Sequence, residues 1–290
     1  MRRSMLFLPG NNPNMLINAT CLGADAIIFD LEDAVSPTEK DAARLLVSSL
    51  LHYMDYTGVE TIVRINSVDT PYWQSDLDAV LPEGPSVILL PKTSTPKDVL
   101  TVDEYITAYE AEHDLIRNTF GIMPLIETAL GVENSYLIAS ATPRVVALFL
   151  GAEDLTADLQ CIRTKEGREI EYARTRLVVA ARAAGVDVYD TPFTDVNDDE
   201  GIVADARLAR ALGFTGKASI SPRHIKAINA AFTPTEKEIS YAYEVIEAIE
   251  RAKAEGKGAI SLYGKMIDAP IVARAERTIA IAEALGIRRA

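Results

Sequence analysis

The sequence predicts an α/β protein, a (β/α)8 TIM barrel with a helical extension at its C-terminal end. Two observations carry this prediction. Eight short apolar runs recur along the first 220 residues, and stretches with the period of amphipathic helices separate most of them. Runs that are apolar throughout, rather than alternating, indicate parallel strands that are covered on both faces. The composition fits a large folded core, since 48% of the 290 residues are hydrophobic and 24% are charged.

The apolar runs have the length of buried strands. They span residues 5–8, 26–29, 61–65, 87–90, 120–126, 145–150, 186–189 and 217–220. Helix-period stretches between them cover residues 39–51, 96–112, 169–184 and 198–212. Eight strands with intervening helices is the number that closes a barrel. An open, doubly wound sheet is the alternative, and it is disfavoured because no Gly-x-Gly-x-x-Gly motif follows the first run.

Residues 1–233 are therefore assigned to the barrel, and residues 234–290 to a C-terminal helical extension. Two helices are expected there, at residues 236–254 and 273–285, with an irregular segment at residues 261–270 between them. Gly256 and Gly258 are expected to end the first of these helices. We expect the extension to be part of the same structural unit as the barrel and to contribute to a subunit interface.

The chain is acidic, with a formal net charge of -13 and a pI near 4.8. Such a charge repels phosphate backbones, so no nucleic-acid partner is expected. No apolar stretch approaches the roughly 20 residues that a membrane span needs, so no membrane partner is expected either. Pro9 and Gly10 interrupt the N-terminal apolar run too early for a signal peptide. Two cysteines do not form a disulfide framework, and we expect a cytoplasmic protein.

Acidic residues follow several of the apolar runs, where barrel enzymes place their active sites. These acidic residues are Asp30, Glu32, Asp33, Glu127, Glu153, Asp154 and Asp190. Because carboxylates in one cleft repel each other, the pattern favours a bound divalent cation, and oxygen ligands favour Mg²⁺, or secondarily Mn²⁺, over zinc. Glu127 and Asp154 close consecutive strands and are the natural pair for one ion. The alternative is that they form ion pairs with Arg64 and Lys92, which also follow strands.

Seven short strings resemble those of the citrate lyase β subunits, a group within the HpcH/HpaI aldolase superfamily that also includes malyl-CoA lyases. In chain order they are RSMLFLPG at 3–10, DLEDAV at 30–35, EKDAAR at 39–44, VRIN at 63–66, LPKT at 90–93, GAED at 151–154 and GKMID at 264–268. The resemblance implies a Mg²⁺-dependent barrel, trimeric or built from trimers. It implies a retro-Claisen cleavage of a citryl thioester, carried on an acyl carrier protein or coenzyme A, to oxaloacetate and an acetyl thioester. It also implies transferase (α) and acyl-carrier (γ) subunits as partners.

The resemblance also implies roles for individual residues. Glu127 and Asp154 match the metal ligands, and Glu127 also contacts substrate. Arg64 matches the substrate-binding arginine, a cation suited to stabilising the enolate that forms as the bond breaks. Asp268 matches an aspartate that, in related lyases, enters the active site of a neighbouring subunit, and it is assigned as general acid/base; its alternative role is an ordinary helix N-cap. We expect Asp30, Glu32, Asp33 and Lys92 to surround these groups, where they hold waters or orient Arg64.

Three other functions remain as alternatives. One is a stand-alone lyase of the same superfamily that acts on malyl-CoA or citramalyl-CoA. Another is a non-catalytic assembly subunit, which is disfavoured because Arg64, Glu127 and Asp154 are all present. The third is a barrel aldolase with a Schiff-base lysine, Lys92 or Lys217, which the carboxylate pair disfavours.

Overall fold

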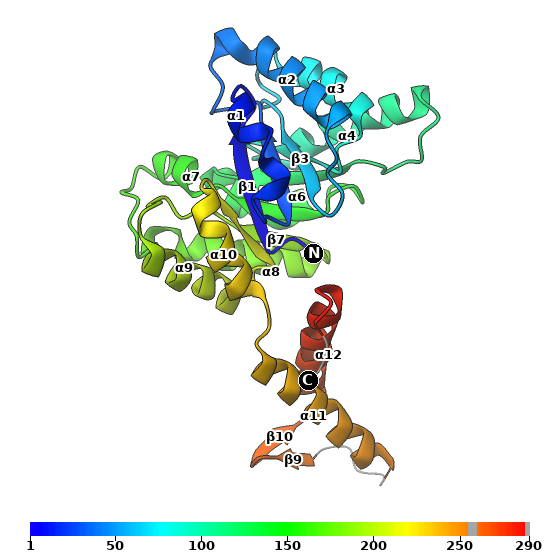
Figure 1. Ribbon diagram of the computed structural model, residues 1–290, viewed down its shortest axis with the longest axis vertical. Helices are drawn as coiled ribbons and strands as arrows, with labels where there is room; N and C mark the ends of the chain where they lie inside the picture. Colours follow the sequence, from blue (N-terminus) through cyan, green and yellow to red (C-terminus); the bar gives the residue numbers. More distant parts are fainter. Residues whose placement is uncertain (255–259, 288–290) are drawn as a thin grey trace. The chain divides into compact units, whose positions relative to one another are not determined.

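The chain folds into two compact units in the computed structural model, which describes residues 1–254 and 260–287. One unit comprises Arg2–Asn229, and the other comprises Ala230–Ala290 together with Met1. In the first unit, eight parallel strands form a closed barrel surrounded by helices (Figure 1). The strands are β1 (Ser4–Pro9), β2 (Ala26–Asp30), β3 (Glu60–Arg64), β4 (Val87–Leu90), β5 (Gly121–Ile126), β6 (Ala147–Leu150), β7 (Asp187–Asp190) and β8 (Gly216–Ser219). Because β1 pairs with β8, the predicted barrel is confirmed and the open-sheet alternative is wrong.

Helices and short 3₁₀ turns connect the strands. The helices are α1 (Pro13–Leu16), α2 (Lys40–Tyr53), α3 (Trp73–Val80), α4 (Pro96–Glu112), α5 (Ala129–Glu133), α6 (Ser135–Ala139), α7 (Ala152–Asp158), α8 (Glu171–Ala184), α9 (Asp199–Leu212) and α10 (Pro222–Phe232), and the turns are η1 (Ala19–Cys21), η2 (Pro37–Glu39), η3 (Leu81–Glu83) and η4 (Arg168–Ile170). The four predicted helices correspond to α2, α4, α8 and α9. The bounds of α4 are those predicted, because Thr95 and Asp98 form a capping box. Gly185 and Gly213 directly follow α8 and α9 as C-caps, and their φ angles of 75° and 107° suit glycine.

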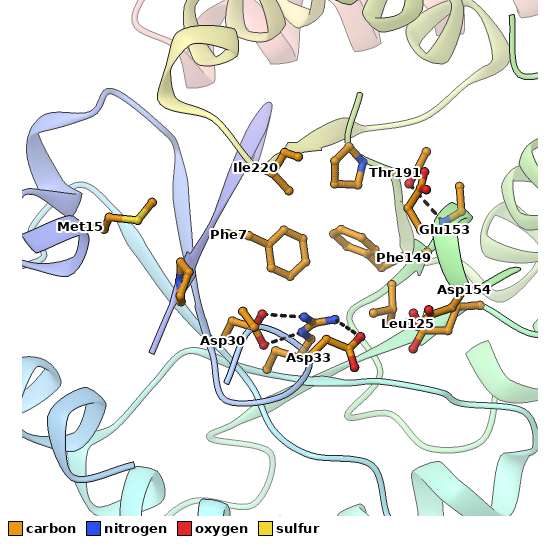
Figure 2. Close-up of a pocket in the computed structure, with 17 residues that line it drawn as sticks. Phe7, Met15, Asp30, Asp33, Leu125, Phe149, Glu153, Asp154, Thr191 and Ile220 are labelled. Atoms are coloured by element: carbon orange, nitrogen blue, oxygen red, sulfur yellow. Dashed lines mark hydrogen bonds and ion pairs between the residues drawn. The ribbon is translucent and has the colours of Figure 1, made fainter. Parts of the chain in front are cut away.

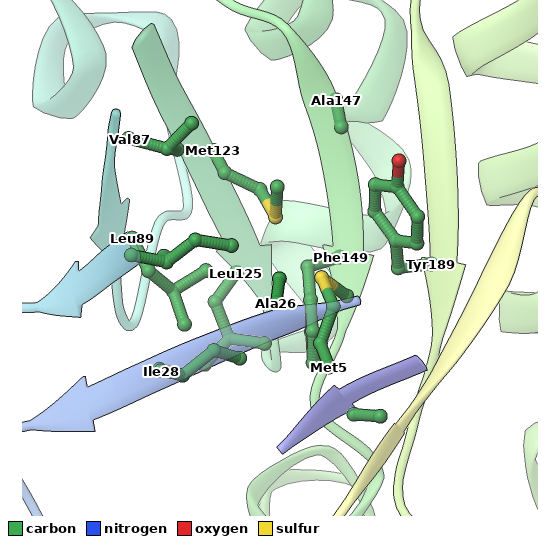
Figure 3. Packing of buried hydrophobic residues seen from close by; sticks show 12 residues of the cluster. Met5, Ala26, Ile28, Val87, Leu89, Met123, Leu125, Ala147, Phe149 and Tyr189 are labelled. Atoms are coloured by element: carbon green, nitrogen blue, oxygen red, sulfur yellow. The ribbon is translucent and has the colours of Figure 1, made fainter. Parts of the chain in front are cut away.

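Side chains from alternate strand positions fill the barrel interior (Figure 3). This cluster consists of Met5, Ala26, Ile28, Ile62, Val87, Leu89, Met123, Leu125, Ala147, Phe149, Tyr189 and Ala218. The residues between them, such as Ile27 and Ile88, point to the opposite face of the strand and are also buried. Burial on both faces explains why the strands appear in the sequence as continuous apolar runs.

Four buried charged side chains join α8, α9, β7 and β8. Arg174 donates from Nε and Nη2 to the two oxygens of Asp190, each at 2.9 Å, and from Nη2 to Asp205 at 2.7 Å. Lys217 lies 2.6 Å from the same two carboxylates and donates to the Thr191 carbonyl at 2.5 Å. Two cations thus balance two carboxylates, as a buried ionic cluster requires. The cluster fixes the C-terminal end of β7.

The second unit contains α11 (Glu236–Ala254), β9 (Ile260–Leu262), β10 (Lys265–Ile267) and α12 (Ala269–Ala284). Helix α11 confirms the prediction for 236–254. Helix α12 begins at residue 269 rather than 273, because Asp268 caps it by accepting the Ile271 N–H at 3.4 Å and Pro270 suits its first turn. None of the helices in the described part of the chain is both long and apolar enough to cross a membrane.

The prediction of an irregular segment at 261–270 is wrong over most of its length. Strands β9 and β10 pair in an antiparallel hairpin, with Leu262 opposite Lys265. Tyr263 and Gly264, which form its turn, both have positive φ angles (52° and 74°), as two-residue hairpin turns of type I′ require. Such turns are usually signalled by Asn-Gly or Asp-Gly, which is absent here. Gly256 and Gly258, expected to end α11, lie outside the described residues.

Candidate functional site

A cavity of about 450 Å³ opens at the C-terminal ends of the barrel strands (Figure 2). One side of it is apolar: the rings of Phe7 and Phe149 meet edge to face with centroids 5.8 Å apart. The charged residues that line it are Asp30, Asp33, Arg64, Glu127, Glu153 and Asp154. The cavity therefore sets most of the predicted site residues beside an apolar wall.

Arg64 ends β3 opposite Asp30 of β2. Its Nε and Nη2 donate to the two carboxylate oxygens of Asp30 at 2.8 and 2.6 Å, and Nη1 lies 3.0 Å from Glu32 Oε2. The guanidinium carbon is 5.2 Å from the centroid of the Phe7 ring, within range of a cation–π contact. Burial lowers the pKa of Arg64, but the carboxylates of Asp30 and Glu32 raise it by more. Arg64 is thus a fixed, protonated cation at the cavity wall.

Lys92 follows β4 with a left-handed backbone, φ 52°. Its backbone N–H donates to Glu127 Oε1 at 2.6 Å. Its ammonium contacts the Glu32 carboxylate and lies 3.2 Å from Asp33 Oδ1 and 4.0 Å from Asp154 Oδ2. Burial lowers the pKa of the ammonium, but the hydrogen bond and charge of Glu32 and the charge of Asp33 raise it by more. A strongly held ammonium is a poor nucleophile, which opposes the Schiff-base role for Lys92.

Glu32 and Asp33 lie side by side in the loop after β2, but their environments differ. Burial raises the pKa of Glu32, and the charges of Arg64 and Lys92 only partly offset this. Burial also raises the pKa of Asp33, but Arg64, Glu32 and Lys92 lower it by more. The loop therefore places a buried carboxyl group, that of Glu32, and a half-exposed one, that of Asp33, beside the cations Arg64 and Lys92.

Glu127 follows β5 and is 3% exposed. Burial, with the neighbouring charges of Asp154 and Glu32, raises its pKa to about 8 against the lowering effects of the Lys92 N–H and Arg64. Asp154 lies in the first turn of α7, its side chain is 43% exposed, and it lines the same cavity. A buried carboxyl group beside a second carboxylate is a place where a bound cation relieves repulsion.

Glu127 and Asp154 are the residues best placed to hold a metal ion. Among residues 1–254 and 260–287, no group of three or more His, Cys, Asp or Glu side chains has the arrangement of a metal site. A zinc site needs three or four protein ligands, whereas Mg²⁺ is commonly bound by one or two carboxylates, with waters and substrate oxygens completing its octahedron. The donor set therefore fits Mg²⁺.

Within the barrel unit, the structure brings seven of the sequence-predicted residues together. Five of them, Asp30, Asp33, Arg64, Glu127 and Asp154, line the cavity, and Glu32 and Lys92 contact its lining residues. Asp268 belongs to the second compact unit, where its carboxylate caps α12. Lys217, the other candidate for a Schiff base, is fully buried and held by Asp190 and Asp205.

Sequence reasoning missed the apolar wall and two contacts of the loops around the cavity. The strand alternation offered a signal for Phe7, because it lies two residues after the inward-pointing Met5. Thr191 accepts the Ala152 N–H at 3.2 Å and so joins the loops after β6 and β7. Glu153 pairs with Arg163 at 3.2 Å, a contact for which the sequence has no pattern.

The chain resembles known proteins along its whole length. A sequence model of the HpcH/HpaI aldolase/citrate lyase family matches residues 3–222. The citrate lyase subunit beta of Leuconostoc mesenteroides subsp. cremoris is 46% identical over 284 residues, which cover 98% of this chain and 94% of that one. That of Escherichia coli (strain K12) is 42% identical over 287 residues, covering 99% and 95%. The L-malyl-CoA/beta-methylmalyl-CoA lyase of Rhodobacter capsulatus is 34% identical, covering 98% and 95%.

Solved structures from Mycobacterium tuberculosis share the fold. The protein CitE in complex with magnesium, acetoacetate and coenzyme A superposes with a TM-score of 0.80 at 30% identity, covering 97% of this chain and 98% of that one. A citrate lyase beta subunit complexed with oxaloacetate and magnesium gives a TM-score of 0.68 at 30% identity, covering 80% and 97%. Together with the family match over most of the barrel, these similarities show that the chain belongs to the HpcH/HpaI aldolase/citrate lyase family.

Proposed function

We propose that this chain is a Mg²⁺-dependent carbon–carbon lyase, the β subunit of a citrate lyase, which cleaves a citryl thioester to oxaloacetate and an acetyl thioester. The observation that carries the proposal is the pairing of Glu127 and Asp154 with Arg64 around one cavity. Identities of 42% and 46% to citrate lyase β subunits, over nearly the whole chain, support the choice of substrate.

Glu127 and Asp154 would hold the metal ion, with Mg²⁺ the best fit and Mn²⁺ a substitute. Two relatives of the fold carry magnesium together with a small oxo-acid, which supports this assignment. When bound, the ion lowers the pKa of the substrate alcohol and fixes its orientation. The raised pKa of Glu127 means that this carboxyl group gives up a proton when a cation binds.

Arg64 would act on the thioester side of the substrate. As the carbon–carbon bond breaks, the alcohol loses its proton, the alcohol carbon becomes a ketone, and the bonding electrons move onto the thioester as an enolate. Nε and Nη2 of Arg64 are occupied by Asp30, so Nη1, beside Glu32 and Asp33, is the donor face that the substrate would use. A preorganised cation there stabilises the transition state more than the ground state.

The protonation step and the assembly complete the proposal. Asp268 would act as general acid/base, which returns a proton to the nascent acetyl carbon; the GKMID string at 264–268 supports this role. We propose that the helical extension contributes to a subunit interface and that the chain forms homotrimers or multiples of them. Transferase (α) and acyl-carrier (γ) subunits are the proposed partners, with the thioester on the carrier protein or on coenzyme A, in the cytoplasm.

A malyl-CoA or citramalyl-CoA lyase is the second candidate, because the Rhodobacter capsulatus enzyme is 34% identical over nearly the whole chain. One experiment separates the two. The purified chain is incubated separately with citryl-CoA, malyl-CoA and citramalyl-CoA, in Mg²⁺ or in excess EDTA. Oxaloacetate is measured with malate dehydrogenase and NADH, and glyoxylate and pyruvate by phenylhydrazine trapping. Mg²⁺-dependent oxaloacetate release from citryl-CoA supports the proposal; product from malyl-CoA or citramalyl-CoA alone would replace it with the second candidate.

A further inference from the structure

We propose that Lys92 and Gly151 are positioning residues that hold the Glu127 carboxylate from two sides through their backbones. The inference rests on the proposed metal site and adds to it. Glu127 follows β5, and the two residues come from the loops after the neighbouring strands β4 and β6. On one side the Lys92 N–H donates to Glu127 Oε1 at 2.6 Å. On the other, a Cβ added to Gly151 would lie 2.5 Å from Glu127 Oε2, so the carboxylate occupies the space of the missing side chain.

The backbone at Lys92 has a conformation that a lysine rarely adopts. Its φ of 52° lies in the left-handed region, where glycine is the favoured residue. The next residue is pinned, because the Thr93 N–H donates to the Leu125 carbonyl at 3.2 Å and the Thr93 hydroxyl donates to the Leu90 carbonyl at 2.9 Å. Strain of this kind persists where the surrounding structure fixes it, and it concentrates at functional sites. Here the conformation points the Lys92 N–H at Glu127.

The side chain of Lys92 explains why glycine does not occupy the position. The ammonium contacts Glu32 and lies 3.2 Å from Asp33, so it links the loop after β4 to the loop after β2. One residue therefore performs two separate tasks: its backbone orients Glu127, and its ammonium neutralises the neighbouring carboxylates. Substitutions can separate the two tasks.

Gly151 acts from the other side by lacking a side chain. Its φ of -104° is open to alanine, so the obstacle is steric. An added Cβ would lie 2.5 Å from Glu127 Oε2, 2.8 Å from Glu127 Cβ and 3.2 Å from Leu125 Cδ1. Its N–H donates to the Ile126 carbonyl at 2.9 Å, which fixes its distance from β5. An alanine here would displace the whole Glu127 side chain, because both its carboxylate and its Cβ would lie closer than real Cβ contacts allow.

The test compares Lys92→Gly, Lys92→Met and Lys92→Val in the full-length chain. All three substitutions remove the ammonium group. Glycine adopts a positive φ readily, methionine adopts it about as easily as lysine does, and β-branched valine adopts it poorly. Mn²⁺ binding to the metal-free protein is measured from the electron paramagnetic resonance signal of free Mn²⁺. We expect the glycine and methionine variants to bind within about threefold of each other, and the valine variant to bind at least about tenfold more weakly.

Two further variants complete the test. Asp114→Val is the matched control, because Asp114 has a φ of 54° in an exposed position outside the cavity lining; Mn²⁺ binding should be unchanged. Gly151→Ala should weaken binding at least about tenfold without any change of charge. Equal affinities for the glycine and valine variants, or an unchanged affinity for Gly151→Ala, would overturn the inference. Absence of Mn²⁺ binding by the wild-type chain would instead refute the proposed metal site itself.

Discussion

Glu127 should make the metal-free barrel less stable at pH 8 than at pH 6. Burial raises the pKa of its carboxyl group to about 8 in the folded state, from the ordinary value of 4.5 that applies in the unfolded state. Since the folded state holds the proton more tightly, this stabilisation is fully present below pH 4.5 and is lost as the pH rises through 8. Between pH 6 and pH 8 the folded carboxyl passes from almost fully protonated to half ionised. The corresponding loss of unfolding free energy is about 2 kcal/mol.

Urea unfolding in EDTA measures this loss directly. The only tryptophan, Trp73, lies in α3, so its fluorescence reports on the barrel unit. Glu127→Gln is the matched variant, because the amide oxygen can accept the Lys92 N–H but does not titrate. Between pH 6 and pH 8, the free energy of unfolding of the wild-type chain should fall by about 2 kcal/mol more than that of the variant. An identical pH dependence in both proteins would show that Glu127 does not carry the buried proton.

Metal binding should reverse the effect. A cation that binds only the folded state favours the ionised carboxyl group and stabilises the protein in proportion to its occupancy. Saturating Mg²⁺ should therefore abolish the decline toward pH 8. Mn²⁺ affinity should fall by about tenfold for each pH unit below 8, because binding releases one proton. A pH-independent affinity would mean that the metal does not bind at Glu127.

Three substitutions test the rest of the site and its support. Asp154→Asn should weaken Mn²⁺ binding at least about 100-fold and leave the far-UV circular dichroism unchanged, because it removes a ligand whose side chain is 43% exposed; wild-type affinity would refute the assignment. Arg64→Lys should lower turnover at least about 100-fold, since an ammonium cannot reproduce the forked donor that Asp30 holds; near-normal rates would remove Arg64 from the mechanism. Gly10→Ala should destabilise the barrel by about 1–3 kcal/mol in urea, because its Cβ would lie 2.7 Å from the Asp30 carbonyl oxygen; an unchanged midpoint would contradict the close contact.

The barrel could be predicted from the sequence because its signals are local. Buried parallel strands are apolar throughout, and helix α4 is marked at its start by Thr95, Pro96 and Asp98. The hairpin of β9 and β10 was not predictable in the same way, since its strands have three residues each and its Tyr263-Gly264 turn lacks the usual Asn or Asp. Strands this short, without a characteristic turn sequence between them, have too few residues for a hydrophobic pattern to be recognised.

The site was predictable in position but not in detail. Parallel strands bring their C-terminal ends together, so residues such as Glu127 and Asp154 had to meet once the barrel was assumed. The pairing of Arg64 with Asp30 depends on strand register, and the contact of Lys92 with Glu127 depends on one backbone dihedral angle. Neither the strand register nor this dihedral angle can be predicted from the sequence of a single chain.

The charge balance of the cavity has a consequence for the order in which reactants enter. Its charged lining consists of five carboxyl groups and one guanidinium, and Asp30 already occupies two of the donors of that guanidinium. A citryl thioester carries carboxylates of its own. In the metal-free cavity the Arg64 guanidinium and the Lys92 ammonium, the cations nearest to it in the described part of the chain, are both engaged by protein carboxylates, so a bound cation adds positive charge that the substrate can use. The charge balance of the cavity therefore favours an order in which the cation enters first or arrives already chelated by the substrate.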